Sequence, residues 1–443
     1  MGEAVVNIEF FDTTMRDGDQ ALPEENQFDV GDKEDIARTI AGFGVNVIEA
    51  GFPRTPGDAE EVRQVASTVG NQSFAVMDWQ SEALSGTWEA NEFTGVTTRT
   101  PVIAGLSRTT VQDIDATWDA IQGAERPRIH TFISTDAYHM AKRFPGKTPD
   151  EVLRMGRDAI RMARQYTDAH SGGSLEFSAE AASTTDDEFS EIVVRMAVSE
   201  GIDILNMPDT VGQKRPLWMY KFYSRVLDWA LAENENIVVS AHNHNDLGNA
   251  SANSFAFVEA AADVAERRGK PVNIQIEGTF CGIGERAGNA DLFTVMGNVF
   301  KYAGELAVPL RWQNNPETSV KSARTVMEFA GLDVDRQNPV VGSDIIVQRA
   351  GVHSDGVAKG DFWMYSPFDP RFWGHEFSVV HEDGKYQGAA GRAAIAASQN
   401  DRVASYSGAS DVRAALAGHS DAGSIASDYK GFEKELAEAG VTV

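Results

Sequence analysis

The chain has 443 residues, enough for one large domain with smaller appended regions. Its composition, 42% hydrophobic and 24% charged, is ordinary for a water-soluble globular fold. With 39 basic and 66 acidic residues the net charge is −27, which argues against nonspecific binding to nucleic acid or an anionic membrane. The apolar runs are too short to span a membrane, the N-terminus lacks a secretory pattern, and a single cysteine excludes an internal disulfide. We therefore expect a cytoplasmic protein.

Short apolar segments alternate with helix-length amphipathic segments along most of the chain. The expected strands cover residues 6–12, 45–51, 102–106, 128–133, 174–179, 204–208, 237–242 and 272–278. The expected helices cover residues 31–43, 57–68, 111–122, 148–166, 186–199, 215–233, 249–268 and 290–303. This alternation favours an α/β fold, a (β/α)8 TIM barrel, over an open doubly wound sheet.

Two regions depart from this alternation. Residues 78–100 contain Trp, Thr and Gly without a clear period, and they predict an inserted loop or hairpin on the barrel rim. A structural or oligomer-contact role suits this insertion better than a catalytic one. Beyond residue 305 we expect a helix at 316–331, a Gly-rich loop, an Ala-, Ser- and Gly-rich stretch from 388 and a helix at 429–439. The chain therefore divides into a TIM-barrel domain, 1–305, and a smaller, partly helical C-terminal region, 306–443.

A pair of histidines ends the expected strand 237–242. His242 and His244 are two positions apart, so both imidazoles face the same side of an extended segment. Two neutral imidazoles on one side form half of a metal site, although two histidines with ordinary hydrogen-bond partners are the more common explanation. In a TIM barrel the other ligands would come from the C-terminal ends of other strands. Polar residues do gather at those ends: Arg16, Asp17, His130, Ser178, Glu180, Asn206, Thr210, Glu285 and Asn289.

Arg16 and Asp17 follow the first expected strand directly. One interpretation is a local ion pair that closes a loop. The other sends Asp17 to a divalent metal and Arg16 to a substrate carboxylate or a developing oxyanion, because an arginine fork suits planar anions. Both interpretations fit this segment taken alone.

A glycine-rich segment, 277–289, follows the eighth expected strand. It lacks the Gly-Lys-Ser/Thr of a Walker loop, and Gly282, Gly284 and Gly288 do not have the spacing of a dinucleotide-binding motif. Cys281 is expected to be a small buried residue and not a nucleophile, because no adjacent histidine activates it.

Four segments together resemble one family. They are 12–20 (DTTMRDGDQ), 206–212 (NMPDTVG), 242–248 (HNHNDLG) and 282–289 (GIGERAGN). They look like the signatures of the 2-isopropylmalate synthase and homocitrate synthase family, and the likeness continues more weakly through 351–356 and 391–394. The resemblance implies a metal-dependent TIM barrel that condenses acetyl-CoA with a 2-oxo acid.

The resemblance also implies roles for individual residues. The metal, Zn, Mn or Mg, would be bound by Asp17, His242, His244 and Asn289. The 2-oxo acid would be bound by Arg16 and Thr210 in a pocket lined by His130, Ser178 and Asn206. Besides Arg16, the catalytic candidates are Glu180 and His353, which resembles a histidine that reaches into the barrel of a partner subunit. We therefore expect a homodimer or a larger homo-oligomer that binds only small-molecule substrates.

Several positions depart from the family pattern and put side-chain selectivity in doubt more than reaction type. Asp19 stands where Glu is usual, Ser354 stands where Gln is common, and no Arg follows Glu180 in the strand-five motif. The wording of 130–135 and 206–210 favours 2-oxoisovalerate as the substrate, which would give 2-isopropylmalate for leucine biosynthesis.

Other activities stay open as alternatives. These are citramalate synthase, homocitrate synthase, which would need a cation for a second substrate carboxylate, and a metal-dependent acyl-CoA lyase or aldolase. A catalytically silent paralogue would have lost ligands, yet all four are present. The chain leaves no room for a leucine-sensing domain, so we expect little leucine feedback by that route.

Overall fold

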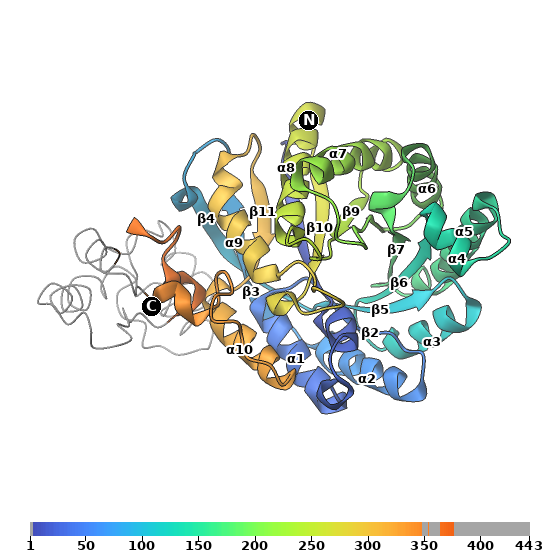
Figure 1. The fold of residues 1–443 in the computed structure, drawn as a ribbon, viewed down its shortest axis with the longest axis horizontal. Helices are drawn as coiled ribbons and strands as arrows, with labels where there is room; N and C mark the ends of the chain where they lie inside the picture. Colours follow the sequence, from blue (N-terminus) through green and yellow to red (C-terminus); the bar gives the residue numbers. More distant parts are fainter. Residues whose placement is uncertain (1–2, 348–352, 354–363, 376–443) are drawn as a thin grey trace, which may run out of the picture.

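The computed structural model describes residues 3–347, 353 and 364–375, and within them eight parallel strands form a closed barrel (Figure 1). The barrel strands are β1 (Val6–Asp12), β2 (Val47–Gly51), β5 (Val102–Arg108), β6 (Pro127–Ser134), β7 (Ser174–Glu180), β8 (Ile204–Asn206), β9 (Val238–His242) and β10 (Val272–Gly278). Each strand pairs with the next, and β10 returns to β1 in parallel register along its whole length. The predicted (β/α)8 TIM barrel is therefore confirmed.

Helices follow the barrel strands and surround them. They are α1 (Val30–Phe43), α2 (Pro56–Ser67), α3 (Val111–Ile121), α5 (Pro149–Thr167), α6 (Asp187–Ser199), α7 (Pro216–Glu233), α8 (Ala250–Arg268) and α9 (Leu292–Tyr302). All eight lie within two residues of the expected bounds. A short helix that the sequence did not predict, α4 (Ala137–Arg143), precedes α5.

Local signals explain where several helices begin and end. The Thr148 side chain accepts from the Glu151 N–H, and Pro149 occupies the first position of α5, where its missing N–H is not needed. Helix α1 ends at Gly44, which adopts a φ of +98°. A Cβ there would lie 2.7 Å from the Cα of Asn314, so only glycine fits this close approach.

The barrel interior is more polar than is usual for this fold, in which branched apolar side chains dominate. The large apolar core lies between the strands and the helices, and only Phe11, Val47, Val102 and Ala104 form a separate apolar cluster. Hydrogen bonds across the barrel join buried polar side chains of five strands: Glu49, Arg128, His130, Glu176, Ser240, Gln275 and Glu277. The barrel interior therefore contains a hydrogen-bonded network of charged and polar side chains.

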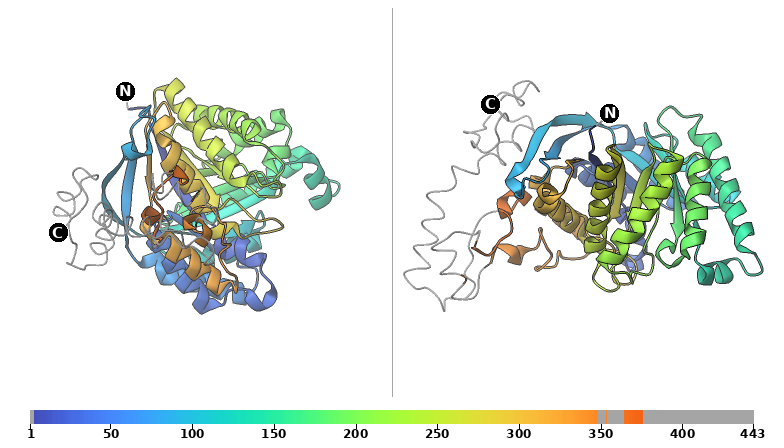
Figure 2. Two further views of the ribbon diagram at one scale, coloured as in Figure 1. Left: turned by 60° about the vertical axis from the view of Figure 1, so that its left-hand side comes forward. Right: turned by 90° about the horizontal axis from the view of Figure 1, so that it is seen from above.

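The insertion forms a hairpin outside the barrel. Strands β3 (Phe74–Ser81) and β4 (Asn91–Arg99) pair with each other and, through β3, with β11 (Leu310–Gln313), which lies beside β1 (Figure 2). The hairpin begins a few residues before the expected position. The Trp79 ring contacts Phe93 within the hairpin at a centroid distance of 6.0 Å, and it anchors the hairpin against Phe300 and Phe372 at 5.0 and 5.7 Å.

The described part of the post-barrel region lies on the outside of the barrel. Helix α10 (Ser319–Phe329) replaces the expected helix at 316–331, and the turn Pro370–Trp373 packs against Phe300 of α9. The expectations for the stretch from 388, for the motif 391–394 and for the helix at 429–439 fall outside the described residues. No helix in the described ranges is long and apolar enough to cross a membrane. The division at residue 305 stays a prediction.

Candidate metal centre

A tight turn after β1 brings Arg16 and Asp17 toward the barrel axis. The Thr13 carbonyl accepts the N–H groups of Arg16, Asp17 and Gly18 at 2.9–3.2 Å, which winds Thr14–Gly18 into a single π-type turn. Such turns are rare and occur often at functional sites. The Thr13 hydroxyl also accepts from the Asp17 N–H at 3.4 Å. Both side chains are therefore fixed from the backbone upward.

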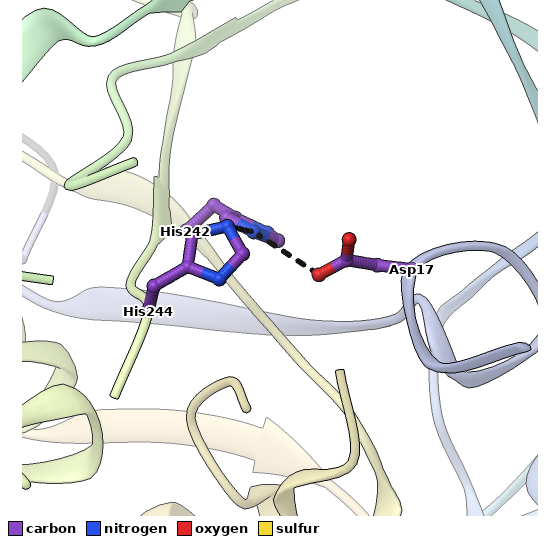
Figure 3. A group of neighbouring side chains, drawn as sticks. All are labelled: Asp17, His242 and His244. Atoms are coloured by element: carbon purple, nitrogen blue, oxygen red, sulfur yellow. Dashed lines mark hydrogen bonds and ion pairs between the residues drawn. The ribbon is translucent and has the colours of Figure 1, made fainter. Parts of the chain in front are cut away.

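Asp17, His242 and His244 meet at the C-terminal end of the barrel (Figure 3). One ligand atom from each lies within 4.8 Å of the others, and all three side chains are buried. The two Nε2 atoms are 3.3 Å apart, and His242 Nε2 lies 3.9 Å from Asp17 Oδ2. The predicted combination of the histidine pair with Asp17 is thus present in space, although β1 and β9 are far apart in the sequence.

The electrostatics of this group suit a divalent cation. Burial lowers the pKa of both histidines to about 4, so both imidazoles are neutral at physiological pH. Burial alone would raise the pKa of Asp17, but Arg16 and the two histidines lower it below its usual value. Because His242 Nδ1 faces Glu277 Oε2 at 3.2 Å, its proton belongs on Nδ1, and Nε2 turns a lone pair to the centre. A carboxylate and two neutral imidazoles form a donor set typical of Zn²⁺ or Mn²⁺.

Asn289 lies beside this group, and its amide nitrogen, not its amide oxygen, faces Asp17. Its Nδ2 donates to Asp17 Oδ2 and, at 3.2 Å, to the Ile283 carbonyl. Its Oδ1 is buried and has no hydrogen-bond partner in the described part of the chain. A cation at the centre would satisfy such an orphaned oxygen if the amide turned over. The role of Asn289 as a ligand stays a prediction.

Glu49 is a functional residue that the sequence reasoning missed. It is fully buried on β2, where Oε2 accepts from Thr13 Oγ1 and Arg16 Nε, each at 2.6 Å, and Oε1 lies 2.7 Å from His130 Nδ1. Arg16 and His130 overcome the effect of burial and hold its pKa well below the usual range. Glu49 therefore positions Arg16, whose Nη1 also pairs with Asp17 at 3.1 Å. The signal available in the sequence was a single acidic residue within an otherwise apolar strand, where that strand approaches the mouth of the barrel.

The predicted pocket residues also come together. His130 Nε2 lies 2.6 Å from Ser178 Oγ, which accepts from Asn206 Nδ2 at 2.9 Å, and all three side chains are buried. Burial alone would lower the pKa of His130. Glu176 and Glu49 outweigh this effect and raise the pKa to about 9. His130 is therefore a buried cation at neutral pH.

Two buried carboxyl groups lie in the barrel close to the centre. Burial raises the pKa of Glu176 to about 8, and the neighbouring Glu277 adds to this shift. Burial also raises the pKa of Glu277, but the charge of His130 and hydrogen bonds from Glu176 and Ser240 oppose the rise. Glu176 therefore keeps a proton at neutral pH and can donate it to Glu277, whose Oε2 faces His242 Nδ1 at 3.2 Å.

Glu180 and Thr210 lie at neighbouring strand ends, and both are already engaged. Glu180 accepts from Ser134 Oγ, and its Oε1 pairs with Arg143 Nη2 at 2.7 Å. Thr210 Oγ1 accepts from the Ala181 N–H at 3.0 Å. Arg143, on the unpredicted helix α4, thus pairs with the glutamate whose motif lacks its usual arginine.

His353 differs from the buried residues of this group in its exposure. It is exposed, and its ring stacks on Tyr365 with centroids 4.1 Å apart. Its catalytic role stays a prediction, and its neighbour Ser354 lies outside the described residues. Cys281 is half-buried and not fully buried as expected. Its partial burial still raises the pKa far above the ordinary thiol value, in agreement with the expectation that it is not a nucleophile.

The chain matches a known protein family over most of its length. A family model described as HMGL-like matches residues 7–315. The chain belongs to the HMGL-like family. The resemblance seen in the four sequence segments is confirmed at this level.

Its curated relatives in the family include 2-isopropylmalate synthases. That of Pyrococcus furiosus is 35% identical over 381 residues, which cover 84% of this chain and 64% of the relative. That of Pelotomaculum thermopropionicum is 36% identical over 353 residues, 80% of this chain and 60% of the relative. The chain thus spans less than two thirds of the length of these relatives.

Solved structures of low identity share the fold. An HMG-CoA lyase from Bacillus subtilis is 17% identical, with a TM-score of 0.52 over 76% of this chain and 98% of the lyase. An HMG-CoA lyase from Pseudomonas aeruginosa is 15% identical, with a TM-score of 0.50 over 75% of this chain and 95% of the lyase. At these identities the likeness concerns the barrel alone.

Proposed function

We propose that the chain is a metal-dependent acyltransferase that condenses acetyl-CoA with a 2-oxo acid. One observation carries the proposal: the buried group of Asp17, His242 and His244 lies beside Arg16 at the C-terminal mouth of the barrel. The names of the curated relatives support this reaction class. We also propose a homodimer, because the motif around His353 resembles that of a histidine that reaches into the barrel of a partner subunit.

The residues present fit a divalent ion and a 2-oxo acid. An ion bound by Asp17, His242 and His244, with Asn289 as a further ligand, would polarise the keto group as a Lewis acid. In the described contacts Arg16 uses Nε for Glu49 and Nη1 for Asp17, which leaves Nη2 for a substrate oxygen. There the guanidinium stabilises the negative charge that develops on the former keto oxygen.

The proposed reaction forms one carbon–carbon bond and hydrolyses one thioester. A base on the protein removes a proton from the methyl group of acetyl-CoA, and the resulting carbanion forms a bond to the keto carbon. The keto oxygen takes up a proton and becomes a hydroxyl group. Water then cleaves the thioester, which releases a carboxylate and the CoA thiol.

Glu180 and His353 are the candidates for the base. The carboxylate of Glu180 is already engaged in an ion pair with Arg143. An imidazole is suited to proton transfer near neutral pH, so we favour His353.

The charges around the mouth favour an oxo acid with a neutral side chain. Arg16, Arg108 at the end of β5, and Arg143 on α4 are each paired with a carboxylate. A second substrate carboxylate, as in 2-oxoglutarate, would compete with those acids for the same cations. We therefore propose 2-oxoisovalerate as the substrate and 2-isopropylmalate as the product, with citramalate synthesis from pyruvate as the runner-up.

A substrate panel tests this proposal. Metal-loaded protein is assayed for release of the CoA thiol from acetyl-CoA with 2-oxoisovalerate, pyruvate or 2-oxoglutarate. We expect the fastest turnover with 2-oxoisovalerate, and loss of activity in His242→Ala but not in the matched variant His139→Ala on α4. Faster turnover of another oxo acid refutes the substrate. Cleavage of an acyl-CoA without any condensation refutes the reaction class.

A further inference from the structure

Strands β9 and β10 carry a hydrogen-bonded row of polar side chains inside the barrel, and this row ends at the candidate metal centre. The two strands pair in parallel register, with Gln275 beside Ser240 and Glu277 beside His242. Residues two apart on a strand face the same side, so all four side chains share the barrel interior. The pairing of the strands therefore places a carboxylate next to one of the two histidines.

Hydrogen bonds fix the direction of each group in this line. Arg128 Nη1 donates to Gln275 Oε1 at 2.6 Å, and Gln275 Nε2 donates to Ser240 Oγ at 3.0 Å. The Ser240 hydroxyl donates to Glu277 Oε1 at 2.7 Å, and Glu277 Oε2 faces His242 Nδ1 at 3.2 Å. Ser240, Gln275 and Glu277 are fully buried, so solvent does not compete for these bonds.

The second histidine has no such support. His244 Nδ1 is buried and has no hydrogen-bond partner among the described residues. The two imidazoles therefore differ, although each turns Nε2 toward the other. The Glu277 carboxylate orients the His242 ring through Nδ1. The orientation of the His244 ring depends instead on its backbone and on the residues that face its Nε2.

We propose that Glu277 is a positioning residue of the metal centre. Its carboxylate accepts the Nδ1 proton of His242, holds Nε2 toward the cation and makes the imidazole a stronger ligand. A carboxylate behind a metal-binding histidine fixes the ring and raises its basicity, and its loss commonly weakens metal binding about 10- to 100-fold. The inference deepens the proposed function and rests on its metal site.

Metal affinity tests the inference without an activity assay. Zn²⁺ binding to the metal-free protein is measured by competition with a chromophoric chelator. Glu277→Gln keeps a hydrogen-bond acceptor but loses the charge, and we expect its Zn²⁺ Kd to rise about tenfold. Glu277→Met loses both, and we expect a rise of up to about 100-fold. The unfolding midpoint of each metal-free variant shows whether a change in Kd reflects positioning or partial unfolding.

Glu176→Gln is the matched control. Glu176 is equally buried in the same barrel and contacts Gln275, Arg128 and Glu277 itself, but not His242. A glutamine at this position keeps an N–H donor for Glu277. We expect its Zn²⁺ Kd to stay at the wild-type value. An unchanged Kd in both Glu277 variants overturns the inference, as does an equal rise in Glu176→Gln. If the wild-type chain itself binds no Zn²⁺, the metal site of the proposed function fails, and the inference fails with it.

Discussion

The pH dependence of metal binding is the sharpest test of the buried centre. A proton competes with a metal ion for each imidazole, so affinity falls at pH values below the pKa of the ligand. An imidazole with the ordinary pKa of about 6.5 would weaken binding about 30-fold at about pH 5, and two would weaken it about 1000-fold. Burial instead lowers the pKa of His242 and His244 to about 4.

With these lowered values the competition nearly disappears. At about pH 5 both rings are still mostly neutral, so the two together weaken binding by less than about twofold relative to about pH 7.5. The carboxylate of Asp17 changes little over this range, because its pKa lies below the usual value. We therefore expect an almost flat affinity between these two pH values and a steep loss only near pH 4.

Electron paramagnetic resonance of free Mn²⁺ gives the dissociation constant directly at each pH. The His242→Gln variant should lose the binding, which assigns the signal to this centre, and His139→Gln should retain it. A dissociation constant that rises about 1000-fold between about pH 7.5 and about pH 5 would refute the reasoning, because it would show that the histidines titrate as exposed groups do.

Three further outcomes follow from the packing. Glu49→Gln removes the buried charge that pairs with both Arg16 and His130 and leaves Arg16 its contact with Asp17. We expect the free energy of unfolding to fall by about 3–5 kcal/mol in urea titrations; a loss below about 1 kcal/mol contradicts this. Trp79→Ala removes the ring that anchors the inserted hairpin on Phe300, with an expected loss of about 3–5 kcal/mol, and Trp79→Phe should lose less. Cys281 should resist alkylation in the folded protein at about pH 8, since burial raises its pKa; rapid labelling seen by mass spectrometry would be inconsistent with that burial.

Elements that belong to the strand–helix alternation were predictable from the sequence, and two short elements outside it were not. Strand Val6–Asp12 matches its prediction residue for residue, and helix Pro149–Thr167 is displaced by one residue at each end. The seven residues of Ala137–Arg143 are too few to display a helical period. Strand Leu310–Gln313 has four residues and is a strand only because it pairs with β1 and β3.

The sequence by itself determined which side chains stand at the mouth of the barrel. Because parallel strands end at the same rim, the positions of Asp17, His242 and Asn289 after their strands already placed them near one another. A similar rule would have included Glu49, which lies two residues before the end of an apolar strand.

Only the tertiary structure decided how these side chains meet. The pairing of Glu277 with His242 depends on the register between β9 and β10. The pairing of Arg143 with Glu180 depends on a helix too short to show a helical period. The neutral state of the histidines depends on their burial among residues from distant parts of the chain. These quantities are sums over neighbours in space, and a local pattern of residue types does not contain them.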